Sequence, residues 1–231
     1  MKEKERIISV GVSLLIFILY FSWDYLVEGI LSLFQLTDNF LIYAKFVGKF
    51  VFLFLLLFIY RSTFKENLVD LKKNFKSRFL KGLKIFLIGF LCYILCNFLI
   101  SSLNLFEYVP NDFETMYNIF EKNAILMFIM STFYYSIVEE IVFKKSFKDI
   151  LKNKWLFIIV TGLINAVCNI ILSINDPRDF IYLIPNAVFS MCFSYIYYET
   201  DNLIVPIIYR ILYNLIPSLV AFVASMFVVY L

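Results

Sequence analysis

Seven long apolar runs constrain the fold of this chain more than any other feature. An α-helix needs about 20 apolar residues to cross the roughly 30 Å hydrocarbon core of a bilayer. The runs cover residues 7–23, 40–60, 85–106, 124–140, 155–174, 180–198 and 203–230. A backbone in lipid must satisfy its hydrogen bonds internally, which favours helices. The sequence therefore predicts an all-α, polytopic membrane helix bundle with about seven transmembrane helices.

The composition agrees with one membrane domain. Hydrophobic residues make up 62% of the 231 positions, far more than a water-facing fold needs to build a core. No stretch rich in proline, glycine and serine divides the chain, so we expect residues 1–231 to form a single membrane domain. The stretch 24–36 is too short and too charged for a span. We expect an interfacial helix there, which would make an eighth helix.

Charged residues alternate in sign along the connections between the runs. Basic residues gather at the N-terminus and in the expected loops 61–84 and 144–154, whereas the connections between them are acidic. The acidic residues are Asp24, Glu28 and Asp38, then Glu107, Asp112, Glu114 and Glu121, then Asp176 and Asp179. The positive-inside rule then predicts a multi-pass protein of a bacterial-type plasma membrane with its N-terminus in the cytoplasm. The short acidic segment "YETDN" at 198–202 departs from this pattern.

The expected basic loop 61–84 also bears on possible partners. It holds eight basic residues against Glu66 and Asp70, and its aromatic residues do not have an interleaving suited to base stacking. We therefore expect contact with membrane lipids and no nucleic-acid binding.

The absence of histidine excludes several kinds of site. Without an imidazole the chain has no His-ligated metal site, no His general base and no Ser-His-Asp triad. The four cysteines lie inside apolar runs and lack the spacing of a zinc site. We expect neither a bound metal nor a cofactor.

Ionisable residues near or inside the apolar runs are functional candidates, because a charge in lipid is costly unless it is paired. Glu139 and Glu140 end the fourth run, and Lys144 follows on the face of Glu140. The two carboxylates differ by about 100° around a helix, so they face different neighbours. The alternative is that both lie solvated at the membrane boundary.

Two later runs carry further polar pairs at helical spacing. Asn165 and Asn169 share one face of the fifth run, where an amide can serve helix–helix packing instead of a site. Arg210 and Asn214 share a face of the last run, and Arg210 lies seven residues inside it. We expect Arg210 to pair with an acid, and the acidic pair that ends the fourth run is the candidate.

Together these residues resemble a known family over residues 124–218, the CPBP (Abi) intramembrane proteases. This family includes CAAX-processing enzymes and bacterial proteins tied to bacteriocin processing and self-immunity. Its pattern is Glu-Glu-x-x-x-Arg, then Phe-x-x-x-His, then His-x-x-x-Asn. "EEIVFKKSFKDIL", "NAVCN" and "ETDNLIVPIIYRILYN" are similar to these motifs in the same order. Lys144 stands for arginine, Asn165 for phenylalanine, Asn169 and Arg210 for the two histidines, and Asn214 is retained.

The resemblance implies glutamate-dependent peptide hydrolysis within the membrane. In such a site Glu139 would activate water with help from the second-motif histidine, and the third-motif histidine and asparagine would stabilise the oxyanion. Here Asn169 cannot relay a proton, and Arg210 would pair with Glu139 or Glu140 and make it a poorer base. We expect Lys144 and Arg210 to form a structural ion pair with the carboxylates.

These substitutions predict a catalytically impaired homologue that acts by binding a membrane protein or an exported peptide, in bacteriocin self-immunity or as an accessory protein. One alternative is an active CAAX-type endopeptidase in which Arg210 serves as the oxyanion donor. Another is a small transporter subunit, although the sequence lacks the repeated halves and paired broken helices of many transporters.

Overall fold

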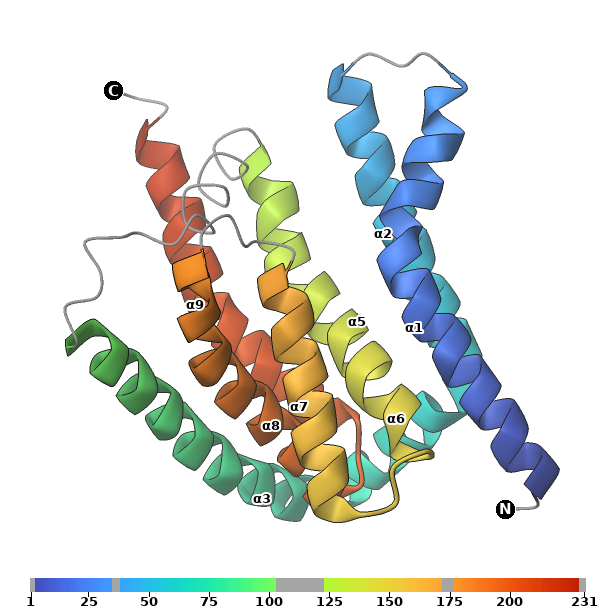
Figure 1. The fold of residues 1–231 in the computed structure, drawn as a ribbon, viewed down its shortest axis with the longest axis vertical. Coiled ribbons are helices and arrows are strands. Elements are labelled where there is room, and N and C mark those ends of the chain that lie inside the picture. Colours follow the sequence, from blue (N-terminus) through green and yellow to red (C-terminus); the bar gives the residue numbers. More distant parts are fainter. Residues whose placement is uncertain (1–2, 35–37, 103–122, 172–176, 229–231) are drawn as a thin grey trace.

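The computed structural model describes residues 3–34, 38–102, 123–171 and 177–228, and within these residues it contains helices and no strand (Figure 1). The long helices are α1 (Glu3–Ser32), α2 (Asp38–Ile59), α3 (Arg61–Ser102), α7 (Lys154–Ile171), α8 (Leu183–Thr200) and α9 (Ile204–Val228). A further helical rod spans Asn123–Lys148 and contains η1 (Met130–Tyr134), α5 (Tyr135–Glu140), η2 (Ile141–Lys145) and α6 (Ser146–Lys148). The short 3₁₀ turn η3 (Pro177–Tyr182) precedes α8.

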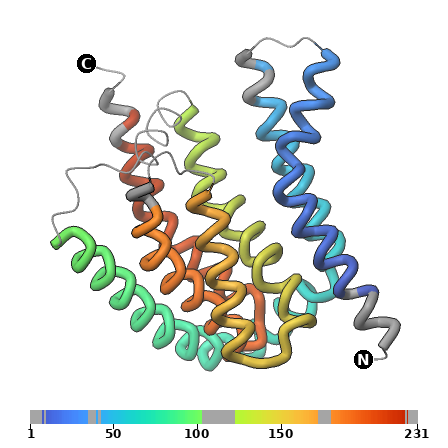
Figure 2. The backbone as a smooth tube through the Cα atoms, viewed as in Figure 1, coloured from blue at the N-terminus to red at the C-terminus, as the bar shows by residue number. Residues whose placement is uncertain are grey.

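The predicted all-α polytopic bundle is confirmed. In the described part of the chain, six helices are long and apolar enough to cross a membrane. The remaining predicted span, 40–60, forms α2, which has 22 residues and carries Asp38, Lys45 and Lys49. Figure 2 shows α1 and α2 as an antiparallel hairpin beside the other helices. The start of α1 and the end of α9 lie at opposite ends of the bundle (Figure 1).

The expected interfacial helix at 24–36 is wrong in its described part, because α1 continues unbroken through Ser32. Its charges find partners on α2, where Lys45 pairs with Glu28. The Trp23 indole donates a hydrogen bond of 2.9 Å to the Gly48 carbonyl. A Cβ atom at Gly48 would lie 2.9 Å from Val27, so glycine allows α2 to approach α1 closely.

The expected loop 61–84 is also wrong, because these residues are helical and continue into the predicted span 85–106 as α3. The backbone departs from helical geometry at Asn74, with φ −119° and ψ 23°. This kink lies within the charged part of α3, which extends to Lys84 before the apolar part begins. The first half of α3 lies at the end of the bundle where α1 begins (Figure 1).

The fourth predicted span does not end at Glu140. The rod continues to Lys148, so Glu139 and Glu140 lie inside a 26-residue helical segment and are not at its boundary. Lys144, which the sequence assigns to a basic loop, is fully buried. The solvated-boundary alternative for the acidic pair is therefore wrong.

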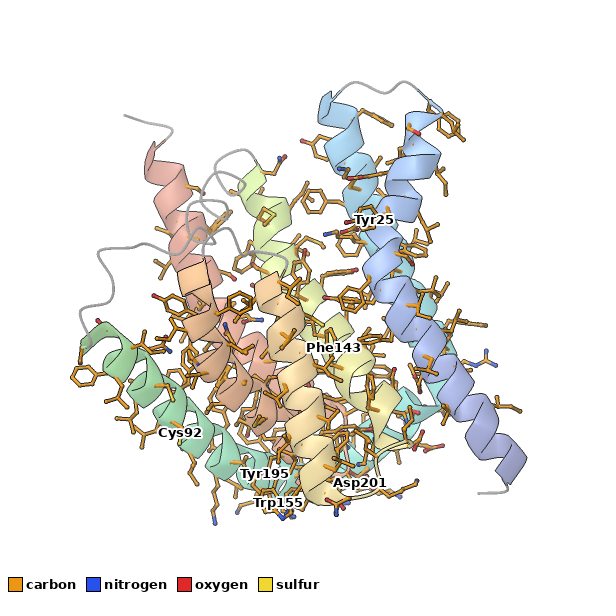
Figure 3. All side chains as sticks on the ribbon, in the orientation of Figure 1. Tyr25, Cys92, Phe143, Trp155, Tyr195 and Asp201 are labelled. Atoms are coloured by element: carbon orange, nitrogen blue, oxygen red, sulfur yellow. The ribbon has the colours of Figure 1, made fainter. Side chains whose placement is uncertain are left out.

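The acidic segment 198–202 is neutralised by lysines from three other elements. Glu199 pairs with Lys81 and Lys154, and Asp201 pairs with Lys148. Figure 3 shows Asp201 at the same end of the bundle as Trp155 and Tyr195. We call Lys81, Lys148, Lys154, Glu199 and Asp201 the surface ion cluster. Its lysines explain why an acidic segment lies at the basic end, because they cancel its charge.

Several acidic residues used for the expected topology lie outside the described residues, namely Glu107, Asp112, Glu114, Glu121 and Asp176. The cytoplasmic N-terminus stays a prediction.

Helix α8 packs between α3 and α7 through two glycines. A Cβ atom at Gly89 would overlap with Cys192 Sγ, and one at Gly162 would overlap with Met191 Cγ. No side chain larger than hydrogen fits either contact without a shift. The close approach places Phe193 of α8 beside charged groups on η2 and α9. Its ring centre lies 5.9 Å from Lys144 Nζ and 5.5 Å from the Arg210 guanidinium carbon.

Candidate functional site

Four charged side chains gather in the interior of the helical bundle. Glu139 is 6% exposed, Glu140 and Lys144 are 0% exposed, and Arg210 is 9% exposed. The two acids come from α5, the lysine from η2 and the arginine from α9. We call these four residues the buried ion cluster. Its formal charge is zero, which is the condition for burying charges at acceptable cost.

Two wide helical turns set the direction of the acidic pair. In η1 the Tyr135 amide donates to the Met130 carbonyl five residues earlier, and in η2 the Ser146 amide donates likewise to Ile141. Each such π turn accommodates one extra residue and rotates the following helix by about 100°. Helix α5 lies between the two turns, and it presents both Glu139 and Glu140 to the interior.

Arg210 bridges the two carboxylates. Its Nη1 donates to Glu140 Oε1 at 2.8 Å, and its Nη2 donates to Glu139 Oε2. Lys144 Nζ donates to the same Glu140 Oε1 at 2.8 Å. One guanidinium therefore joins both acids, whereas the ammonium serves Glu140. The expected difference in neighbours holds in part, because the acids share Arg210 but differ in their other donors.

Two amides of α7 complete the environment of Glu139. Asn165 Nδ2 lies 3.1 Å and Asn169 Nδ2 3.4 Å from Glu139 Oε2. Asn169 Nδ2 also lies 3.0 Å from Asn165 Oδ1. With Arg210, three nitrogen donors point at one carboxylate oxygen, which therefore has little capacity left to accept a proton from water.

Asn214 occupies a different position from the other predicted site residues. Its Nδ2 donates to Ser136 Oγ at 2.9 Å, and Ser136 in turn donates to the Thr132 carbonyl at 2.7 Å. Its described hydrogen bond therefore holds α9 against α5 one turn before Glu140 and does not reach the acidic pair. Ser136 is fully buried, and nothing in its spacing marks it as a partner for Asn214.

Two aromatic residues of the site carry no sequence signal. The ring of Phe193 lies under both cations of the buried ion cluster, at distances typical of cation–π contacts. The ring centre of Tyr20, on α1, lies 5.2 Å from that of Phe143, which precedes Lys144 in the rod. Phe193 is one of 28 phenylalanines and Tyr20 is one of 16 tyrosines, so neither stands out before the helices are packed.

The arrangement is suited to holding charge more than to transferring protons. A general base needs an oxygen free to take a proton from water, and Glu139 Oε2 is surrounded by donors. Glu140 Oε2 has no hydrogen-bond partner within the described residues, but it is buried. Over the same residues, no group of three or more His, Cys, Asp or Glu could hold a metal ion.

Comparison with known families gives a match over the part of the chain that holds the site. Residues 121–216 match the Rce1-like family, described as type II CAAX prenyl endopeptidase Rce1-like. This range includes every residue of the buried ion cluster and both α7 amides. The match confirms the resemblance to CPBP proteases that the motifs predict. No curated protein and no solved structure matches the chain.

Proposed function

We propose, from the match of residues 121–216 to the Rce1-like family, that this CAAX protease-like multi-pass membrane protein is a catalytically impaired homologue that acts by binding. The observation that supports this proposal most strongly is the pair of salt bridges from Arg210 to Glu139 and Glu140. A permanent cation on both acids opposes the proton uptake that a general base must perform. General-base help contributes typically 10²–10⁴-fold, so its loss leaves at most very slow hydrolysis.

A cavity that is lined by none of the residues of the buried ion cluster supports a binding role. It has a volume of about 290 Å³ and lies between α1, α2 and the rod, with Tyr20 and Tyr134 among its lining residues. In its lining, Lys49 Nζ donates to the Tyr135 hydroxyl at 3.0 Å and lies 3.4 Å from Asp24 Oδ2. Aromatic walls with a few placed polar groups are typical of sites that hold a peptide or small ligand. We propose a membrane protein or an exported peptide as the partner, as in bacteriocin self-immunity.

Restoring the family residues tests the impairment directly. The purified wild-type protein and the double variant Asn169→His/Arg210→His are incubated with a membrane-anchored CAAX peptide. We expect no cleavage by the wild type and measurable cleavage by the double variant. Adding Glu139→Gln to the double variant should remove the cleavage. Wild-type cleavage that Glu139→Gln abolishes would show a working enzyme and overturn the proposal.

An active endopeptidase is the second candidate, and one observation favours it. The guanidinium of Arg210 lies beside Glu139, where a cationic donor could stabilise an oxyanion formed by water attack. In that case the wild type should cleave the peptide and the Arg210→Met variant should not. Under the binding proposal there is no cleavage to lose.

We also propose that the N-terminus faces the cytoplasm. The support is that the surface ion cluster, with its three lysines, lies at the end of the bundle where α1 begins (Figures 1 and 3). A reporter that fluoresces only in the cytoplasm, fused to the N-terminus, should be bright. A dark N-terminal fusion together with a bright C-terminal fusion would show the opposite topology and contradict the proposal.

A further inference from the structure

An apolar groove with three cations around it lies where α2 passes into α3. Its cations are Arg61, Lys65 and Lys72. Its apolar floor comes from Leu57 of α2 and from Phe64, Leu68 and Val69 of α3. The groove encloses about 490 Å³. We call this set of residues the basic groove.

The helical spacing of α3 sorts its charges into two faces. At about 100° per residue, Arg61, Lys65 and Lys72 fall within about 40° of one another. Glu66 and Asp70 fall about 140° and 180° from Arg61, on the other side of the helix. No acid therefore lines the basic groove.

The acid on the inner face is fully engaged elsewhere. Asp70 accepts hydrogen bonds from Arg78 at 3.1 Å and from Asn202 at 2.9 Å. Asn202 also donates to the Asn67 carbonyl at 2.8 Å, so this face of α3 is fixed to the turn between α8 and α9. The opposite face, with the basic groove, is consequently held outward in one orientation.

The three cations of the groove are without acidic partners among the described residues. All three are exposed, and no ion pair within those residues involves Arg61, Lys65 or Lys72. By contrast, the lysines of the surface ion cluster are paired with Glu199 or Asp201. An unneutralised triad of cations is complementary to a phosphate-bearing anion.

The same face exposes apolar side chains next to the cations. Leu68 is 48% and Val69 47% exposed, and Phe58 on the adjoining turn of α2 is 68% exposed. The Arg61 guanidinium carbon lies 4.9 Å from the Phe58 ring centre. Cations beside exposed apolar residues are typical of helices that lie in the membrane interface, with the apolar groups in the acyl region.

These observations point to an anionic phospholipid as the occupant of the basic groove. We infer that one such lipid binds with its phosphate among Arg61, Lys65 and Lys72, and with an acyl chain against Leu68 and Val69. The site involves none of the residues of the buried ion cluster. It therefore stands independently of whether the protein cleaves peptides.

Native mass spectrometry of the full chain tests this site. The protein is purified from nanodiscs that contain phosphatidylcholine with either phosphatidylglycerol or cardiolipin, and retained lipids are counted. The groove variant is Arg61→Gln/Lys65→Gln/Lys72→Gln. The charge-matched control is Lys73→Gln/Lys76→Gln/Lys152→Gln, which removes three exposed lysines outside the groove. Thermal melting checks that the variants fold, and single Lys72→Gln replaces the triple variant if the triple does not.

We expect the wild type and the control to retain one anionic lipid per chain. The groove variant should lose at least about tenfold in occupancy, and single Lys72→Gln should lose a smaller part of it. Three results would each overturn the site. They are equal retention of phosphatidylcholine, an equal loss in the control variant, and no anionic lipid retained by the wild type.

Discussion

The buried ion cluster and the surface ion cluster use the same chemistry in opposite surroundings. Both pair lysine or arginine with acids at about 2.8 Å, as for Lys144 with Glu140 and Lys81 with Glu199. Lys144 and Glu140 are fully buried, whereas Lys81 is about half exposed. Water and salt screen the exposed pair, but no solvent compensates a charge left alone in the interior. The same contact is therefore essential in one region and nearly dispensable in the other.

The largest expected effect is the loss of the cation that serves both acids. Arg210→Met leaves Glu139 without its guanidinium and Glu140 with Lys144 alone, so the interior keeps a net negative charge. We expect the free energy of unfolding to fall by about 3–5 kcal/mol, the usual result of breaking a buried pair. Denaturant titration in mixed micelles measures it. A loss below about 1 kcal/mol would mean that water reaches the cluster and compensates the unpaired charge.

Removing one charge of each sign should do much less harm than removing either alone. The variant Glu140→Gln leaves the buried ion cluster with a net charge of +1, and Lys144→Met leaves it with −1. We expect each variant to lower the free energy of unfolding by about 3 kcal/mol. The double variant stays neutral, and its stability should return to within about 1 kcal/mol of wild type. Additive losses in the double variant would mean that the two residues act independently.

A medium effect is expected from the α7 amides, which are neutral. Asn165→Leu removes a hydrogen bond to Glu139 but leaves the ion pairs in place, so we expect a loss of about 1.5–3 kcal/mol. Asn97→Leu is the control, because the hydrogen bond that Asn97 donates within the described residues goes to the Tyr93 carbonyl of its own helix, at 2.9 Å. Equal losses in the two variants would show that the hydrogen bond to Glu139 does not account for the loss of stability.

The smallest effect is expected in the surface ion cluster. Lys154→Gln leaves Glu199 paired with Lys81 and open to water, so the melting temperature should stay within error of wild type at physiological salt. Any difference seen at low ionic strength should disappear as salt is added. A salt-independent fall in melting temperature would show that this cluster behaves like the buried one.

The sequence predicts the partners of Arg210 for a simple physical reason. A charge seven residues inside an apolar run has few acids within reach, and the cost of leaving it unpaired is high. The apolar runs predict the bundle equally well, because a lipid-embedded backbone has no alternative to the helix at this length. Strong constraints of this kind leave little room for tertiary context to intervene.

Other features follow from packing and could not be predicted. The two π turns around α5 have no sequence mark, yet they set the direction of Glu139 and Glu140. The charge-rich first half of α3 resembles a polar loop in the sequence, because the number of charges does not show on which face of a helix each charge lies. Its inner face becomes visible only when Asn67 and Asp70 contact Asn202. Asn214 likewise has the right spacing from Arg210 but bonds to Ser136.

A double-mutant cycle between Glu139 and Arg210 tests the central claim most directly. The claim is that Arg210 neutralises the acids of a family site and leaves them unsuited to catalysis. The unfolding free energies of wild type, Glu139→Gln, Arg210→Met and the double variant are measured in the same micelles. We predict a coupling of at least about 2 kcal/mol, with the double variant more stable than Arg210→Met. Additive effects within about 0.5 kcal/mol would contradict the account.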